Sequence, residues 1–162
     1  MPNHCHNRVT IYGSGNDTDE TRAQIAKLKQ ICEDENCFGQ IIPEPDWANT
    51  PLMSKDVQGL VYDRGKVGEL PVKTKGAFGE SYRFASGEID DRWYDWRLQN
   101  WDTKWDAYDV VVTDDDPDQF EVEFNTAWSP PEAICNELRE QYPDVEISWF
   151  FDEPGCEIAG YL

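Results

Sequence analysis

Apolar and polar residues alternate over several short stretches of the chain, which is the pattern of strands with one buried face. In residues 119–125, Phe120, Val122 and Phe124 alternate strictly with Glu121 and Glu123. Successive strand residues point to opposite faces of a sheet, so this period of two predicts one buried and one exposed face. Strands are predicted by this alternation and by β-branched runs at 7–12, 108–113, 119–126, 145–151 and 156–161.

Two segments show the helical period instead, together with start and stop signals. Residues 19–32 carry apolar residues on one helical face, and Asp17 with Glu20 has the spacing of a capping box. Residues 131–142 follow the run Ser129-Pro-Pro, which is typical of a helix start with Ser129 as the N-cap. Both segments are therefore predicted to be helices.

The order of these elements predicts an α+β fold of the ferredoxin-like type. Strand, helix, strand, strand, helix, strand is the βαββαβ order, in which helices cover one face of an antiparallel sheet. The segment 156–161 adds an extra C-terminal edge strand, and residues 38–106 form a large insertion after the first helix. We therefore expect a single ferredoxin-like domain over 1–162, with a short extended piece at 38–45 and one short helix and loop within 46–92.

The net charge of −19 is concentrated in the second half of the chain. Residues 93–162 hold 18 acidic but only 3 basic side chains, and the run 114–118 includes four aspartates. Nucleic-acid binding needs Lys and Arg to neutralise phosphates, so this balance argues against direct binding of DNA or RNA. We expect the aspartate run to form the turn between two strands, because Asp accepts turn geometry and Pro117 fixes it.

Alternation places many carboxylates on the sheet face that the helices leave open. RNA-recognition domains of similar topology carry stacking aromatic and basic residues there, whereas acidic residues dominate here. The candidate acidic binding face comprises Glu121, Glu123, Glu146, Glu157, Asp114, Asp115 and Asp116. The acidity either serves binding or reflects only an acidic source proteome.

Five of the seven tryptophans lie between residues 93 and 128. Trp93 and Trp96 fall within a predicted helix over about 90–99, while Trp105 and Trp128 adjoin strand ends. Large rings near strand ends are expected to pack between sheet and helix, so we interpret the tryptophans mainly as core. The alternative makes Trp93 and Trp96 anchors of an interface, since Trp is enriched at binding hot spots.

No motif in the sequence predicts catalysis, a metal or a cofactor. His4, Cys5 and His6 could suggest a zinc site with Cys32 and Cys37, but adjacent strand residues point to opposite faces, and Cys5 cannot join both histidines. The aspartate run lacks the spacing of an EF-hand loop, and there is no phosphate-binding glycine motif. We therefore expect a protein that is not an enzyme.

Nothing in the sequence indicates export or membrane insertion. No apolar run approaches the roughly 20 residues that a membrane helix needs, and the N-terminus lacks the pattern of a signal peptide. The five cysteines are an odd number, which in a cytosolic chain is better interpreted as reduced thiols than as disulfides.

Several short motifs resemble the YubB-like proteins, small proteins of tailed phages and conjugative plasmids that contain a ferredoxin-like domain. The resemblance rests on Met1–Asn3 with Cys5 and Asn7, on NWDTKWDAY at 100–108, on FNTAWSPP at 124–131, and on Glu153–Gly155 before Ala159–Gly160. The chain departs from the family pattern at His4, where Trp is expected, and at Asp102, where Gly is expected. The resemblance implies a ferredoxin-like fold and a protein encoded by a mobile genetic element that acts in the cytoplasm of the bacterial host. It transfers no active site.

Together these observations predict an acidic, non-enzymatic binding protein of a phage or plasmid. Its partner would be a basic surface of a host protein, and the acidic face would act as a mimic of DNA. The alternatives are an accessory factor that binds a small ligand or nucleic acid through the sheet face, and an enzyme of unrecognised type.

Overall fold

The computed structural model describes residues 3–15, 18–57, 64–77 and 79–162, which divide into two compact units. The first unit combines residues 1–43 with 97–162, and the second comprises residues 44–96. The second unit is narrower than the expected insertion 38–106, because the residues at both ends of that range belong to the first unit.

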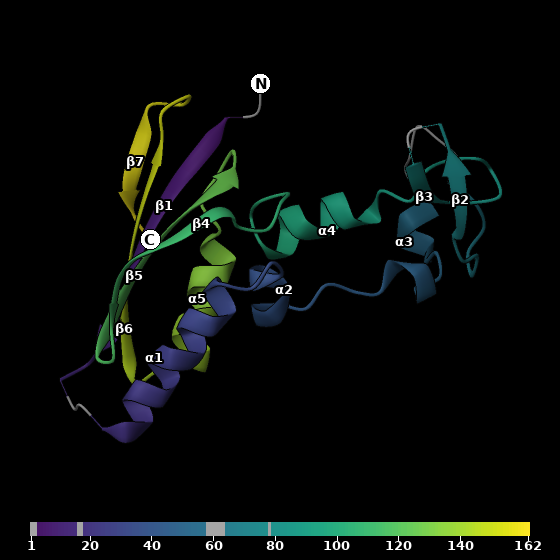
Figure 1. Ribbon diagram of the computed structural model, residues 1–162. Coiled ribbons are helices and arrows are strands. Elements are labelled where there is room, and N and C mark those ends of the chain that lie inside the picture. The colour runs from purple at the N-terminus through teal and green to yellow at the C-terminus, as the bar shows by residue number, and fades with distance from the viewer. Residues whose placement is uncertain (1–2, 16–17, 58–63, 78) are drawn as a thin grey trace. The chain divides into compact units, whose positions relative to one another are not determined.

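A five-stranded antiparallel sheet forms the first unit, in the order β4-β5-β1-β6-β7 (Figure 1). Its strands are β1 (His4–Gly13), β4 (Tyr108–Asp116), β5 (Gln119–Ala127), β6 (Val145–Glu153) and β7 (Ile158–Tyr161). The first and third strands of the βαββαβ unit, β1 and β5, lie side by side between the second and fourth, β4 and β6. This is the strand order of a ferredoxin-like sheet. The predicted fold class is confirmed, including the extra edge strand at the C-terminus.

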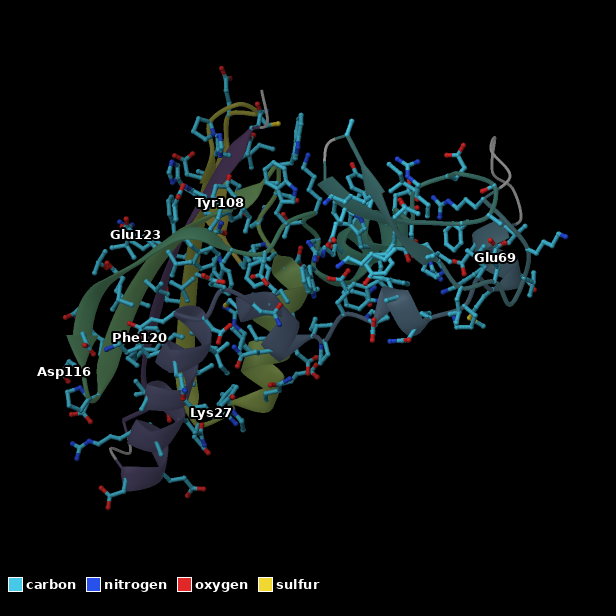
Figure 2. The ribbon with its side chains drawn as sticks, turned by 45° about the vertical axis from the view of Figure 1, so that its right-hand side comes forward. Lys27, Glu69, Tyr108, Asp116, Phe120 and Glu123 are labelled. Carbon is cyan, nitrogen blue, oxygen red and sulfur yellow. The ribbon has the colours of Figure 1, made fainter. Side chains whose placement is uncertain are left out.

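Three helices of this unit lie on one side of the sheet: α1 (Asp19–Cys32), α2 (Cys37–Ile41) and α5 (Glu132–Gln141) (Figure 1). The apolar core lies between them and the sheet, and Leu28, Phe120, Ile134 and Trp149 are almost completely buried. The alternation in β5 predicted this side correctly, since Phe120 points toward the helices while Glu123 points to the other side of the sheet (Figure 2).

A buried polar network fixes the three central strands to one another. Asn7 on β1 is 2% exposed, and its amide donates to Thr126 Oγ1 on β5 at 2.9 Å. Its Oδ1 accepts the indole N–H of Trp149 on β6 at 3.0 Å. Because an unpaired buried amide would cost stability, this matched set favours the native register over a shifted one.

The helix starts differ from the predicted ones. The N-cap of α1 is Thr18, whose hydroxyl accepts the N–H of Thr21 at 3.1 Å; the expected cap Asp17 lies outside the described residues. Ser129 does not cap α5, whose N-cap position is Pro131 without a side-chain bond. The expected extended piece at 38–45 is also wrong, because α2 begins at Cys37 and buries Phe38 against Trp101 and Phe124, with ring centroids 5.8 and 6.0 Å apart.

The strands are longer than predicted at their acidic ends. Asp114, Asp115 and Asp116 are the last residues of β4 rather than a turn, and the turn is confined to Pro117-Asp118. Likewise β6 continues to Glu153, which is buried, and β7 starts only at Ile158. Glu157 therefore precedes the edge strand, in a turn where its φ is +56°.

The second unit contains a short 3-10 helix η1 (Trp47–Asn49), helix α3 (Ser54–Val57) and a hairpin of β2 (Val72–Gly76) with β3 (Gly79–Arg83). Helix α4 (Arg92–Asn100) begins in it and ends in the first unit. The hairpin was not predicted, because its strand residues are mostly polar and exposed and show no apolar alternation.

Arg92 is the centre of the second unit. Its guanidinium is buried, forms a two-bond ion pair with Asp90 at 2.8 and 2.7 Å, and donates to the carbonyls of Trp47, Thr50 and Pro51. It also lies 5.1 Å from the Trp47 ring centroid. A buried charge is tolerated only when it is paired and hydrogen-bonded, and here every nitrogen has a partner.

Candidate functional site

The face of the large sheet opposite the helices is the best candidate for a functional surface. Register and alternation place on it six carboxylates, namely Asp114, Asp116, Glu121, Glu123, Glu146 and Asp152. Among the described residues of these strands, Arg8 is the one Lys or Arg on this face. We call this surface the acidic face.

The acidic residues predicted from the sequence do not all lie on this face. Glu121, Glu123, Glu146, Asp114 and Asp116 do, whereas Asp115 is paired with buried Phe120 and points toward the helices. There its carboxylate forms an ion pair with Lys29 of α1, which raises the pKa of that lysine. Glu157 lies in the turn before β7 and not on the strand.

Asp118, in the turn of the β4–β5 hairpin, is likewise oriented toward α1. Its Oδ2 accepts a bond from Arg22 Nη2 at 3.1 Å, and this arginine lowers the pKa of the carboxyl group. Two of the four aspartates in the run 114–118 are thus compensated by cations of α1. The charge available to a partner is smaller than the sequence suggests, and it lies on one side of the hairpin.

Glu121 is held in a fixed orientation. Its Oε2 accepts the hydroxyl of Thr10 on β1 at 3.2 Å, and its Oε1 accepts the hydroxyl of Thr113 on β4 at 2.9 Å. A carboxylate held between neighbouring strands loses less rotamer entropy on binding than a free one. The centre of the acidic face is therefore partly preorganised.

A row of side chains crosses the sheet next to Glu121. The register pairs Glu123 with Arg8, Arg8 with Phe150, and Phe150 with Tyr161. The Arg8 guanidinium lies 5.5 Å from the Phe150 ring centroid, and Phe150 contacts Tyr161 edge-on. A shallow hollow of about 210 Å³ opens beside this row, lined also by His6 and Asp152.

At the end of the face away from the β4–β5 hairpin turn, aromatic side chains replace the carboxylates. Tyr108 on β4, labelled in Figure 2, is hydrogen-bonded to His4 on β1. Its ring centroid lies 6.1 Å from that of Trp105. Lys104 lies over two indoles, 4.5 Å from the centroid of Trp105 and 5.8 Å from that of Trp128. We call Trp105 and Trp128 the indole pair.

The indoles do not lie in the core, contrary to the interpretation from the sequence. Trp105 is 37% and Trp128 51% exposed, whereas Trp101 and Trp149 are buried. The main chain at Trp128 has φ +74°, a left-handed conformation that points the ring outward. The main-chain N–H of Trp128 donates to the main-chain oxygen of Asn3 at 3.0 Å. Neither adjacency to a strand end nor hydrophobicity could have signalled this, because the backbone conformation decides it.

Two segments distant in sequence are joined directly beneath the indole pair. The Thr103 hydroxyl donates to Ala127 O at 3.0 Å and accepts from Ala127 N at 3.2 Å. Thr103 is fully buried, so both bonds are protected from water. These two hydrogen bonds therefore connect the NWDTKW segment to the TAWSPP segment.

Trp93 and Trp96, the predicted interface aromatics, are half-buried on α4. Trp96 packs edge-on against Trp47, with centroids 6.5 Å apart, and Trp93 packs against Tyr94 at 5.7 Å. They contribute to the packing of the second unit and do not lie on the strands that form the acidic face.

Burial and hydrogen bonding raise the pKa of several thiols. Burial raises the pKa of Cys5 to about 11, while a bond with Cys32 raises the pKa of Cys37. The bond to Glu153 raises the pKa of exposed Cys156. Thiolate is the nucleophilic form, so these environments disfavour cysteine catalysis. Within the described part of the chain, no three His, Cys, Asp or Glu side chains are grouped to hold a metal ion.

No helix of the described ranges is both long and apolar enough to cross a membrane.

A family model supports the ferredoxin-like fold of the C-terminal part of the first unit. Residues 100–162 match the model of the family described as a ferredoxin-like domain in Api92-like protein. A solved structure, protein api92 from Yersinia pseudotuberculosis, is similar with a TM-score of 0.49 and 13% identity, over 99% of this chain and 93% of that chain. No curated protein matches the chain. The family match spans β4 to β7, and therefore most of the strands that carry the acidic face.

Proposed function

We propose that this protein binds a basic surface of another protein through its acidic face. The observation that carries the proposal is the set of six carboxylates around the single Arg8, on a sheet face that the helices of the same unit leave uncovered. Six like charges on one sheet repel one another and lower stability, and a cationic partner would relieve that repulsion.

The finer form of the proposal is a DNA mimic of a phage or plasmid that acts on a host protein. Residues on one face of a strand lie about 6.6 Å apart, and neighbouring strands lie about 4.8 Å apart. Phosphates along one DNA strand are separated by about 7 Å, as estimated from the 3.4 Å rise and the helical path. A surface that normally binds DNA would therefore meet carboxylates at a familiar spacing.

The exposed aromatic residues at the end of the same face are consistent with an interface. Binding sites between proteins are enriched in Trp and Tyr, which supply affinity, while charge mainly accelerates encounter. The arrangement contains both, since Trp128 and Trp105 are exposed next to strands that carry the carboxylates.

The test is capture of partners from a bacterial lysate by the immobilised protein at low and high salt. The variant combines Glu121→Gln, Glu123→Gln and Glu146→Gln, and we expect it to lose most of the salt-sensitive capture. The control removes the same charge from exposed positions on the helical side, by Glu33→Gln, Glu35→Gln and Glu140→Gln. Equal capture by the two triple variants would show that the acidic face is a solubility feature.

The hollow beside Arg8 favours a second candidate, in which the face binds a small anionic ligand. At about 210 Å³ it is smaller than typical ligand pockets of about 300–1,000 Å³. Glu123 and Asp152 also line it and would repel an anion. Titration with nucleoside monophosphates, followed by shifts of the Arg8 side-chain resonances, tests this candidate.

A further inference from the structure

The indole pair already holds a cation. The Lys104 ammonium lies over Trp105 at 4.5 Å and over Trp128 at 5.8 Å, both within the range in which a ring face attracts positive charge. Both indoles remain substantially exposed although a lysine is between them. The same rings are therefore accessible to a second cation that approaches from solvent.

The position of the rings is fixed by the chain beneath them. Thr103 and Ala127 exchange two hydrogen bonds, so the residues that follow each of them, Lys104 and Trp128, are held side by side. Trp128 has φ +74°, which a bulky residue rarely adopts unless the surrounding structure enforces it. Strain that keeps a tryptophan out of the core is a feature of binding sites more than of cores.

We propose that Trp105 and Trp128 form a clamp for an arginine or lysine side chain of a partner protein, and that Lys104 occupies this clamp when no partner is bound. The proposal rests on the proposed function only for the sign of the partner's charge. It adds a specific anchor to a surface that otherwise attracts cations without selecting among them.

Local charge favours a cation over an anion as the incoming group. Residues 102–109 contain three aspartates and Lys104 as the single base. With its lysine included, this segment has a net charge of −2, and this balance favours an incoming cation over an anion. Arg also binds an aromatic face better than Lys, because its planar and weakly hydrated group stacks on the ring.

Replacement of the Lys104 ammonium by a cation of the partner requires no change in the fold. Lys104 lies on the surface segment between α4 and β4, and its flexible side chain can move into water when a guanidinium takes its place. Lys104 then acts as a competitor, so that its removal should strengthen the binding of external cations. If Lys104 served instead to bind an anion, its removal would weaken binding of that anion and would not strengthen the binding of cations.

The experiment titrates N-acetyl-arginine amide into the full-length protein and follows the indole N–H resonances of Trp105 and Trp128. We expect both resonances to shift in the wild type, and Lys104→Met to tighten binding about two- to fivefold, as for loss of a competing cation–π contact. Trp105→Ala should abolish the shift at Trp128. The neutral analogue N-acetyl-citrulline amide should have little effect.

Further variants separate this proposal from the acidic face and from misfolding. The triple Gln variant at Glu121, Glu123 and Glu146 should bind the arginine probe nearly as well as the wild type, so the clamp can fail or succeed independently of the proposed function. If Trp105→Ala does not fold, Trp105→Phe, which retains a smaller ring, replaces it and should reduce the shift at Trp128. Unchanged or weaker binding by Lys104→Met would overturn the clamp, and shifts on adding inorganic phosphate that Lys104→Met removes would identify an anion site instead.

Discussion

Asp102 caps helix α5 from a position 31 residues earlier in the chain, because its Oδ2 accepts the N–H of Ala133 at 2.8 Å. Its main-chain oxygen accepts the hydroxyl of Ser129, the residue that the sequence predicted as the cap. Asp102 itself has φ +61°, a region that Gly enters freely and that Asp tolerates. Asp therefore supplies an acceptor for the helix at a position whose backbone conformation would otherwise favour Gly.

Replacing this remote cap should destabilise the first unit. Asp102→Ala loses the acceptor and must adopt a left-handed conformation, so we expect a loss of about 1–2 kcal/mol in the free energy of unfolding. Asp102→Asn should lose less, since its amide oxygen still accepts the bond. Asp102→Gly should fall between them, because relief of strain offsets part of the lost cap. Urea unfolding followed by circular dichroism measures all three, and equal stability of the Ala and Asn variants would contradict the capping role.

The ion pair of Arg92 and Asp90 should be decisive for the second unit. Arg92→Met leaves a buried carboxylate without its cation and removes a donor from the carbonyls of Trp47, Thr50 and Pro51, so we expect a local loss of about 3–5 kcal/mol. Amide hydrogen exchange of residues 44–96 should accelerate, whereas the protected core strands β1 and β5 should exchange as in the wild type. The double variant Asp90→Leu with Arg92→Met should recover part of the loss. Uniform acceleration over the whole chain would contradict a separate hub in the second unit.

The pair of Asp118 and Arg22 predicts a small dependence of stability on pH. The pKa of Asp118 is lowered in the folded state, so the pair stabilises the fold above the unfolded carboxyl pKa of about 3.9 and loses this effect as pH falls through the lower folded value. Both side chains are substantially exposed, which keeps the effect small and sensitive to salt. The difference in unfolding midpoint between the wild type and Asp118→Asn should therefore disappear in acid. A difference that persists well below the unfolded pKa would have another cause.

Local patterns were sufficient to predict the sheet. Strict alternation in β5 and the helical period in α1 predicted the correct elements and the correct buried sides. Alternation is a strong signal because a register shift of one residue would expose every apolar side chain of the strand. Glu121, Glu123 and Glu146 were placed on the open face for the same reason. Asp152 was missed because the strand was expected to end at 151, one residue before it.

The remaining features depend on contacts between distant segments. No local signal distinguishes Asp115 from Asp114, and only the register with Phe120 and the position of Lys29 orient it toward the helices. The exposure of Trp128 follows from a left-handed backbone residue, and the cap of α5 comes from another part of the chain. Sequence reasoning therefore placed Glu121, Glu123 and Glu146 on the open side of the sheet, but it also included Asp115 and Glu157, which lie elsewhere, and it missed the aromatic end.

Arg8 provides a test in which two candidate functions predict opposite signs. It is the single arginine or lysine among the described strand residues of the acidic face, next to Glu123 and Phe150. Arg8→Gln makes the face more negative, so capture of a basic partner should strengthen several-fold and become more sensitive to salt. If the hollow beside it binds an anion instead, the same substitution should weaken binding, because the cation is lost.

The matched control is Lys27→Gln, which changes the charge equally on an exposed position of α1, on the helical side (Figure 2). Only long-range charge would make the two variants behave alike, and that contribution falls off within a Debye length of about 8 Å at physiological salt. Association rates measured by surface plasmon resonance against a captured partner, at low and physiological salt, distinguish the outcomes. A larger association rate for Arg8→Gln than for Lys27→Gln places the contact on the acidic face, and equal rates would mean that net charge alone attracts the partner.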